Sequence, residues 1–163
     1  MYESLTFPDQ PAATSIMPIN TPALLEELLE NHGYAPTVSG NSLFIPIGGS
    51  EAPYTASFTF DNKGHIRVTC QLAVLGDFPE DKLGELSLAA LDANTQISPY
   101  AFAVIGASEG DVDIHRCPLV LTDTLLCADL SAEEVTFSLD KLLEALTFSR
   151  HILKLGLSHP SAA

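Results

Sequence analysis

Two neighbouring segments of this chain alternate between apolar and polar residues, and a turn sequence separates them. Every second residue is apolar in YTASFTF (residues 54–60) and again in HIRVTCQL (residues 65–72). A period of two is typical of a β-strand that buries one face. The connecting residues DNKG are of the types that favour a tight turn. The sequence therefore predicts an antiparallel hairpin with one apolar face and one polar face.

The residues before the hairpin predict a helix and a short strand. Thr21 is a favourable N-cap, Pro22 suits the first helical position, and the leucines that follow share one face. Gly33 has the position of a glycine that terminates a helix. The apolar sequence SLFIPI (residues 42–47) predicts a strand, and Pro46 favours an edge position for it.

A second helix is predicted from about residue 78 to residue 94. Asp77 and Glu80 have the spacing of a capping box at the start of this helix. Gly84 lies inside the helix, where a glycine costs about 1 kcal/mol relative to alanine. We expect this glycine to allow the close approach of a neighbouring element.

The longest helix is predicted near the C-terminal end. Ser131 and Glu134 form a second capping-box pattern, and Gly156 is expected to end the helix. Several apolar residues lie off the main apolar stripes of the helices, which indicates a surface for a partner. One arginine is a conspicuous positive charge on the polar face of the hairpin. The candidate partner-binding residues are Leu88, Phe137, Phe148, Ile152 and Arg67.

The remaining segments predict strands over residues 100–107, 119–121 and 124–130, with a turn joining the last two. The order is then helix, three strands, helix, about three strands and helix. Antiparallel strand groups with helices between them are typical of an α+β fold, not of a doubly wound α/β fold. The predicted organisation is an extended N-terminal arm (1–20), a single α+β domain (21–157) and a flexible tail (158–163).

The charge of the chain argues against several classes of function. Seven Lys and Arg residues against 21 Asp and Glu residues give a formal net charge of −14, which disfavours binding to nucleic acid or to an anionic lipid surface. No apolar stretch approaches the roughly 18 residues of a membrane helix. The N-terminal residues MYESLTFPDQ lack the basic and apolar parts of a signal peptide.

The cysteines indicate a reducing compartment. Cys70, Cys117 and Cys127 are too few and odd in number for a disulfide scaffold. They also lack the paired spacings that structural zinc sites use. Buried, inert thiols are therefore expected, and the cytoplasm is the expected location of the protein.

Five local sequences, taken in order, resemble one known group of proteins. They are the leucine-rich helix with its glycine (LLEELLENHGY), the short strand SLFIPI, the hairpin FTFDNKGHIRVTCQLA, the helix that closes on an asparagine (LAALDANTQI) and the capped acidic helix CADLSAEEVTFSLDKLLEAL. Over residues 21–155 the chain resembles the type III secretion chaperone-like fold. Class I secretion chaperones share this fold with the YbjN-like group of proposed sensory-transduction regulators.

This resemblance implies a non-enzymatic protein-binding module that is chaperone-like or regulatory. Members of the fold are small, acidic homodimers that hold an extended segment of a partner. By resemblance we expect a homodimer that docks an extended apolar segment of an unidentified protein, by strand addition or in a groove. The resemblance implies no catalytic residues and no cofactor.

A small serine hydrolase is a second function that the residues leave open. The sequence GASEG (residues 106–110) fits the G-x-S-x-G pattern, in which Ser108 would be the nucleophile, and Asp123 and His151 follow in the order that such enzymes use. That motif is a turn from a strand into a helix. The sequence DVDIHRCP that follows has no helical period and ends in a proline, so it favours a glycine-rich turn.

A metal or small-ligand sensor is a third function. Glu109, Asp111, Asp113 and His115 are spaced by two and would share one face of an extended chain. Carboxylates and imidazoles are common metal ligands. Four ligands on one extended segment diverge, however, and they do not readily surround an ion. The spacing therefore favours a solvated acidic loop, and no metal is expected.

Overall fold

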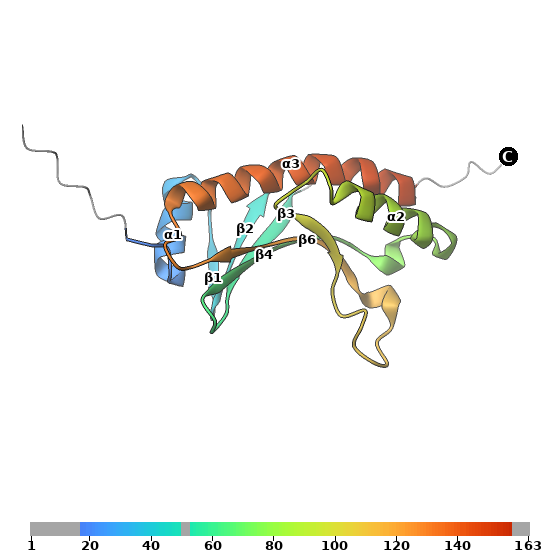
Figure 1. The fold of residues 1–163 in the computed structure, drawn as a ribbon, viewed down its shortest axis with the longest axis horizontal. Helices are drawn as coiled ribbons and strands as arrows, with labels where there is room; N and C mark the ends of the chain where they lie inside the picture. The colour runs from blue at the N-terminus through green and yellow to red at the C-terminus, as the bar shows by residue number, and fades with distance from the viewer. Residues whose placement is uncertain (1–16, 50–52, 158–163) are drawn as a thin grey trace, which may run out of the picture.

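The chain folds around an antiparallel sheet, with one long helix lying across one face of it (Figure 1). This computed structural model describes residues 17–49 and 53–157, so the predicted arm up to residue 16 and the predicted tail lie outside the described residues. The predicted α+β class is confirmed. The elements are α1 (Pro22–Asn31), β1 (Thr37–Ser39), β2 (Ser42–Ile47), β3 (Tyr54–Phe60), β4 (His65–Val74), α2 (Leu83–Ala93), β5 (Ala101–Val104), β6 (Pro118–Leu126) and α3 (Ala132–Leu157), with 3-10 turns at Leu75–Asp77, Glu80–Lys82 and Ile114–Arg116.

The predicted hairpin is the pair β3–β4, and its register places the apolar residues of both strands on one face. Phe58 lies opposite Val68, and both side chains are fully buried. The turn residue Asp61 accepts hydrogen bonds from the backbone N–H groups of Lys63 (2.8 Å) and His65 (2.9 Å). Gly64 closes the turn with φ +83°, a conformation that favours glycine. The prediction of a hairpin with one buried face is therefore confirmed.

The Asp61 turn gives a prediction for pH dependence. Its hydrogen bonds from His65 and Lys63 lower the pKa of the Asp61 carboxyl from 3.8 to about 2. The ionised carboxylate therefore adds stability above pH 4, and this contribution is lost as the pH falls through 2. We expect Asp61→Asn to lower the melting temperature at pH 7 and the difference from wild type to vanish towards pH 2. A constant difference across the titration would contradict this, and Asp92→Asn, an exposed change on α2, is the control.

The N-terminal half of the sheet differs from the sequence prediction in one respect. The strand β2 was expected at an edge, but a short additional strand, β1, pairs with residues 42–44 and forms the edge itself. Pro46 lies beyond the reach of β1 and pairs only with Thr55 on β3. Pro46 therefore has no strand partner on the side of β1, as expected for a residue that has no N–H to donate. Its strand is nevertheless the second in the sheet.

The C-terminal half of the sheet contains one long strand where two short strands were predicted. The sheet order is β1-β2-β3-β4-β6-β5, so β6 lies between β4 and β5. The predicted turn near Thr122 and Asp123 is wrong, because both residues continue the ladder with β4, opposite Thr69 and Val68. Pairing with β4, and for Thr122 also with Ala101 of β5, keeps these polar residues extended despite their turn propensity. β5 is shorter than predicted and forms the second edge.

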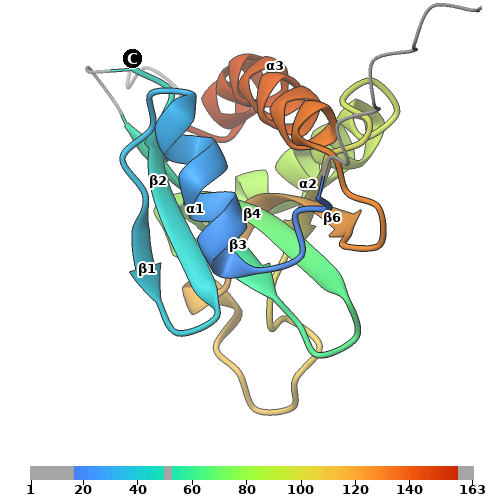
Figure 2. The same ribbon diagram turned by 90° about the vertical axis from the view of Figure 1, so that its left-hand side faces the viewer.

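The two shorter helices lie at opposite ends of the sheet (Figures 1 and 2). The N-cap of α1 is confirmed, since the Thr21 hydroxyl accepts a hydrogen bond from the Leu24 N–H (3.3 Å). The predicted capping box of the second helix is wrong. The Asp77 carboxylate instead accepts from the Val74 N–H (3.0 Å) and closes a 3-10 turn, and α2 begins only at Leu83.

The long helix α3 begins where the capping box predicts. Glu134 accepts hydrogen bonds from the backbone N–H and the hydroxyl of Ser131 (2.8 and 3.0 Å), and the Ser131 oxygen accepts from the Glu134 N–H (3.2 Å). The predicted end at Gly156 is wrong, because this residue lies inside the helix. An added Cβ there would lie 2.6 Å from Cδ1 of Phe78, whereas one at Gly84 would meet nothing within 4 Å. The close approach expected at Gly84 therefore occurs at Gly156.

The capping box gives a prediction for stability. We expect Ser131→Ala to lower the free energy of unfolding by about 1 kcal/mol, because the Glu134 N–H loses its acceptor at the first turn of α3. Chemical denaturation of the purified protein measures the change. Ser87→Ala, an exposed change within α2, is the matched control, and we expect it to leave the stability unchanged or slightly raised. Equal losses from the two variants would contradict a capping role.

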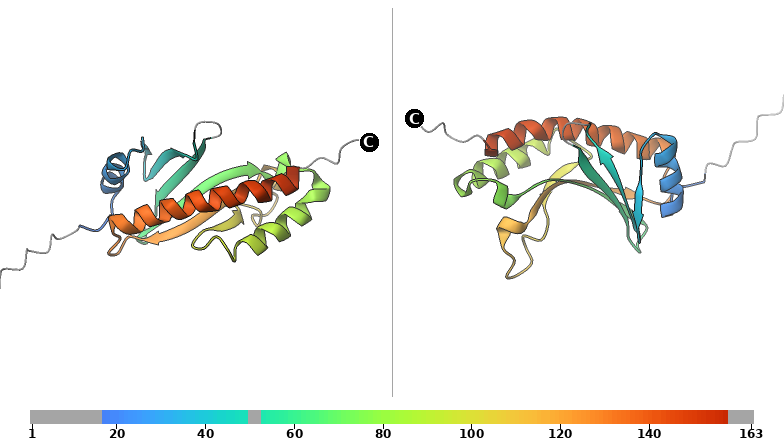
Figure 3. Two further views of the ribbon diagram at one scale, coloured as in Figure 1. Left: turned by 90° about the horizontal axis from the view of Figure 1, so that it is seen from above. Right: turned by 180° about the vertical axis from the view of Figure 1, so that it is seen from behind.

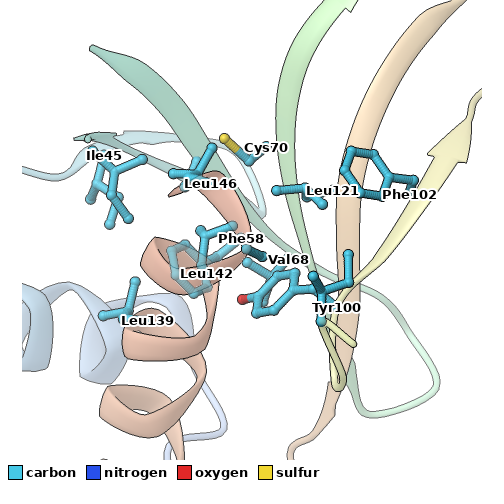
Figure 4. Close-up of a cluster of buried hydrophobic side chains, with 14 of the residues drawn as sticks. Ile45, Phe58, Val68, Cys70, Tyr100, Phe102, Leu121, Leu139, Leu142 and Leu146 are labelled. Atoms are coloured by element: carbon cyan, nitrogen blue, oxygen red, sulfur yellow. The ribbon is translucent and has the colours of Figure 1, made fainter. Parts of the chain in front are cut away.

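The core lies between the sheet and α3. Phe58, Val68 and Leu142 pack together there, with Tyr100 beside them (Figure 4). The Tyr100 hydroxyl and the Ser138 hydroxyl form a buried hydrogen bond of 2.8 Å, which satisfies both groups. The cysteines are free and buried, as the sequence analysis expects, and burial raises the pKa of the Cys70 thiol to about 12. That thiol therefore stays protonated and unreactive.

Within the described part of the chain no α-helix covers the opposite face of the sheet, and the loop between β5 and β6 projects on that side (Figure 3). The strand register places alternate residues of every strand on this face. Most of the residues on this face carry hydroxyl groups, and the others include Phe44 and Arg67. We call this side of the sheet the open face. Its hydroxyl residues on the central strands are Ser42, Thr55, Ser57, Thr59, Thr69, Thr122 and Thr124.

Candidate protein-binding site

An apolar groove runs between α2 and the edge strand β5. It has a volume of about 310 Å³, and its lining is almost entirely aliphatic and aromatic. Leu86 and Phe102 are buried beneath it, whereas Leu91 and Val104 are exposed at its rim (65% and 38%). The sequence places leucines on two faces of α2, so only one face can pack on the core. The lining residues are Leu75, Leu86, Ser87, Ala90, Leu91, Phe102, Ala103, Val104 and Leu119.

The apolar surface extends beyond the groove along both elements. Leu88 is 71% exposed on α2, and Ile105 is 46% exposed directly after β5. Clusters of exposed large aliphatic side chains mark interaction surfaces in soluble proteins. The predicted residue Leu88 is exposed on the same helix but is not among the residues that line the groove. Leu91, which the sequence did not single out, lines it.

The free edge of β5 is partly closed by a side chain. The Asn94 carbonyl oxygen accepts a hydrogen bond from the Phe102 N–H (2.6 Å), and its amide nitrogen donates to the Phe102 carbonyl (3.4 Å). These two bonds replace those of a neighbouring strand residue. Because the N–H and C=O groups of an edge strand point outward at every second residue, only Val104 remains open on the outer side of β5. Strand addition at this edge is therefore restricted.

The segment that contains α2 and β5 is acidic. Between residues 80 and 116 the chain has seven Asp and Glu residues and two basic residues. Both basic side chains are already paired, Lys82 with Glu85 (3.2 Å) and Arg116 with Asp113 (3.8 Å). The segment therefore keeps an excess of negative charge. The acidic residues are Glu80, Asp81, Glu85, Asp92, Glu109, Asp111 and Asp113.

The other predicted contact residues lie apart from the groove. Phe137 is 57% exposed near the start of α3, with the Lys141 ammonium 5.6 Å from its ring centre. Phe148 is half-buried and packs on the core. Ile152 is 5% exposed and belongs to the core, so it is not on a partner surface. Ile152 lies off the main stripe of α3, in the C-terminal half of the helix, beside which α2 lies (Figure 3).

The residues around Ser108 do not form the strand–turn–helix of a serine hydrolase. Gly106 has φ +81° and starts a turn after β5, and the chain then continues through further turns to the 3-10 turn at Ile114. Within residues 17–49 and 53–157, no hydrogen bond joins Ser108 to Asp123 or His151. Asp123 lies on the core side of β6, where burial raises the pKa of its carboxyl. The turn that the sequence favours is the one observed.

The acidic loop after Ser108 has a structural role at one position. The Asp113 carboxylate accepts a hydrogen bond from the His115 N–H (3.0 Å) and caps the 3-10 turn at Ile114–Arg116. Among the described residues, no three His, Cys, Asp or Glu side chains come close enough together to hold a metal ion.

The described residues form a six-stranded antiparallel sheet with one long helix across one face and an apolar groove beside an edge strand, which together define an α+β class of protein. No helix in the described ranges is long and apolar enough to cross a membrane. No protein-family model matches the sequence, and no curated protein is detectably related to it.

A comparison with solved structures identifies the fold as YbjN-like. The crystal structure of YbjN from E. coli, described there as a proposed transcription regulator, matches 78% of this chain and 92% of its own chain with a TM-score of 0.54. The two sequences are 14% identical, so the match establishes the architecture. The resemblance stated from the sequence is confirmed at the level of fold.

Proposed function

We propose that this chain is a non-enzymatic protein-binding module, chaperone-like or regulatory, that acts as a homodimer and docks an apolar segment of a partner protein in the α2–β5 groove. The observation that carries the proposal is the exposed Leu91 in the lining of that groove, with Leu88 also exposed on the same helix. Covering such side chains with an apolar partner is favourable by about 25 cal/mol per Å² of apolar surface removed from water.

The hydrogen bonding of β5 favours docking through side chains over strand addition. Asn94 already occupies both outward backbone groups of Phe102. A partner strand would have to displace that amide, or pair only around Val104. Apolar side chains of a partner can enter the groove without breaking these bonds, as in the recognition of an amphipathic segment by a groove.

The charge of the rim indicates the chemistry of the partner segment. An apolar segment flanked by Lys or Arg residues would meet the acidic residues of α2 and of the loop after β5. A segment flanked by carboxylates would be repelled. The proposed occupant is therefore a basic, apolar segment of another protein.

Site-specific photocrosslinking tests the occupant. A photoreactive amino acid replaces Leu91 at the groove rim in one protein and Thr147, an exposed residue of α3 outside the groove, in the control. After irradiation in native lysate, we expect an adduct from position 91 alone, whose mapped peptide is apolar with flanking Lys or Arg residues. The double charge reversal Glu85→Lys and Asp92→Lys should weaken the adduct. Equal adducts from both positions, or a peptide from this chain alone, would overturn the proposed occupant.

Light scattering tests the homodimer separately. We expect a mass twice that of the 17.4 kDa chain at micromolar concentration. Leu91→Glu and Phe137→Glu place a charge on two different exposed apolar surfaces, so a loss of mass with one variant alone assigns the dimer interface to that surface. If the wild-type protein has the mass of one chain, the proposed homodimer is wrong. The proposal of groove docking would then depend on the crosslinking result alone.

A further inference from the structure

The open face of the sheet contains a polar pocket that is separate from the α2–β5 groove. The pocket has a volume of about 260 Å³ and is lined by Thr59, Asp61, His65, Arg67 and Thr124. These residues come from three neighbouring strands and the hairpin turn. Arg67 lies at the centre, because the register places it opposite Thr59 on β3 and opposite Thr124 on β6.

Arg67 is a cation without an acceptor. Across the described residues, its guanidinium makes no hydrogen bond and no ion pair. The other two arginines have partners, since Arg116 pairs with Asp113 and Arg150 donates to the Gly48 carbonyl (3.4 Å). In a chain with three times as many acidic as basic residues, 21 against seven, an arginine that lacks a carboxylate partner is informative.

The carboxylate in the pocket is already committed to other donors. One Asp61 oxygen accepts from the backbone N–H groups of Lys63 and His65, and the other lies 3.0 Å from Nδ1 of the His65 ring. This contact fixes the ring and leaves Nε2 free to face a ligand. Asp61 therefore acts as a positioning residue for His65 and is not the acceptor for Arg67.

The donors left over in the pocket are the Arg67 guanidinium and the Thr124 hydroxyl. The Thr59 hydroxyl already shares a hydrogen bond with Ser42 (2.9 Å) and can accept or donate a second one. A planar guanidinium flanked by hydroxyl groups is suited to bind an oxyanion through charge-assisted hydrogen bonds.

We propose that this pocket binds a small-molecule oxyanion, a carboxylate or a phosphate, and that Arg67 is the principal residue that binds it. The volume accommodates the anionic group and a few further heavy atoms. The hydroxyl groups on both neighbouring strands orient the anion, and the aligned ring of His65 closes the side next to the turn. This site is independent of partner docking in the α2–β5 groove.

Nuclear magnetic resonance titration tests the site. The probes are sodium phosphate and sodium succinate, each added to the full chain at a constant ionic strength of about 0.15 M, where charges beyond about 8 Å are screened. We expect saturable shifts of the His65 ring and the Arg67 Nε–H signals with at least one probe. Sodium chloride at the same ionic strength is the reference. Shifts with both probes that equal those with chloride would overturn the proposal.

Two variants distinguish anion binding in the pocket from a general electrostatic attraction of anions to the protein. Arg67→Gln and Lys63→Gln remove one positive charge each, but only Arg67 lines the pocket, while Lys63 lies on the exposed turn. We expect Arg67→Gln to weaken anion binding by about tenfold or more, the effect of losing a charge-assisted hydrogen bond. Lys63→Gln should change the affinity less than twofold. Equal effects would mean nonspecific attraction and would also overturn the proposal.

Discussion

Replacement of Gly156 by alanine is expected to lower the free energy of unfolding by about 2 kcal/mol. The added methyl group would lie 2.6 Å from Cδ1 and 3.0 Å from Cε1 of the Phe78 ring, inside normal contact distance. Phe78 is 4% exposed, and Leu86 on α2 lies 3.4 Å from the same position. The ring is held by core neighbours, so relief requires a shift of the segment that leads into α2. Chemical denaturation measures the loss.

The same substitution at Gly84 is the matched control. Gly84 is exposed near the start of α2, and an added Cβ there meets nothing within 4 Å. Its φ is not in the left-handed region. We therefore expect Gly84→Ala to raise the free energy of unfolding by about 0.5 kcal/mol, because alanine favours the helix and restricts the unfolded chain. Opposite changes in the free energy of unfolding from the same substitution at the two glycines would establish that Gly156 is required for contact between α3 and the segment before α2. A neutral or stabilising Gly156→Ala would contradict it.

Replacement of Asn94 by alanine is expected to lower the free energy of unfolding by about 1–3 kcal/mol. The variant leaves the Phe102 N–H and carbonyl without the amide that now pairs with both. These backbone groups are part-buried beneath α2, so water replaces the amide poorly. The edge of β5 also becomes open for pairing with a second chain.

Two measurements separate these effects. Denaturation at low protein concentration gives the loss of stability, and light scattering at rising concentration gives any association beyond that of the wild type. Thr95→Ala, which removes an exposed hydroxyl bonded only to the Asp92 carbonyl (2.8 Å), is the control and should cost less than about 0.5 kcal/mol. A variant as stable as this control would contradict the role of Asn94 at the edge.

The sequence predicted best where neighbouring residues decide the structure. The period of two over residues 54–72 and the residues of the Asp61 turn determine the β3–β4 hairpin. The caps of α1 and α3 are also local, since each joins residues three apart. The sequence failed at β6, where Thr122 and Asp123 favour a turn locally but pair with a strand more than 50 residues away.

The candidate sites were only partly predictable. Leu88 could be singled out because it lies off the apolar face of its helix, but Leu91 could not be distinguished from a core leucine. Ile152 shows the reverse case, since it lies off the stripe of α3 and is nevertheless buried. Arg67 was noticed for its charge, but its lack of an acceptor depends on which residues surround it.

The sequence by itself determined the α+β class, the hairpin with its polar face, and the starting residues of α1 and α3. These features follow from periodicity and hydrogen bonds between residues close in the chain. Only the tertiary structure decided the sheet order, the place of β6 between β4 and β5, the close contact at Gly156 and the amide of Asn94 on the edge of β5. The physical reason is that burial and edge exposure depend on what packs against a residue, and those neighbours are distant in the sequence.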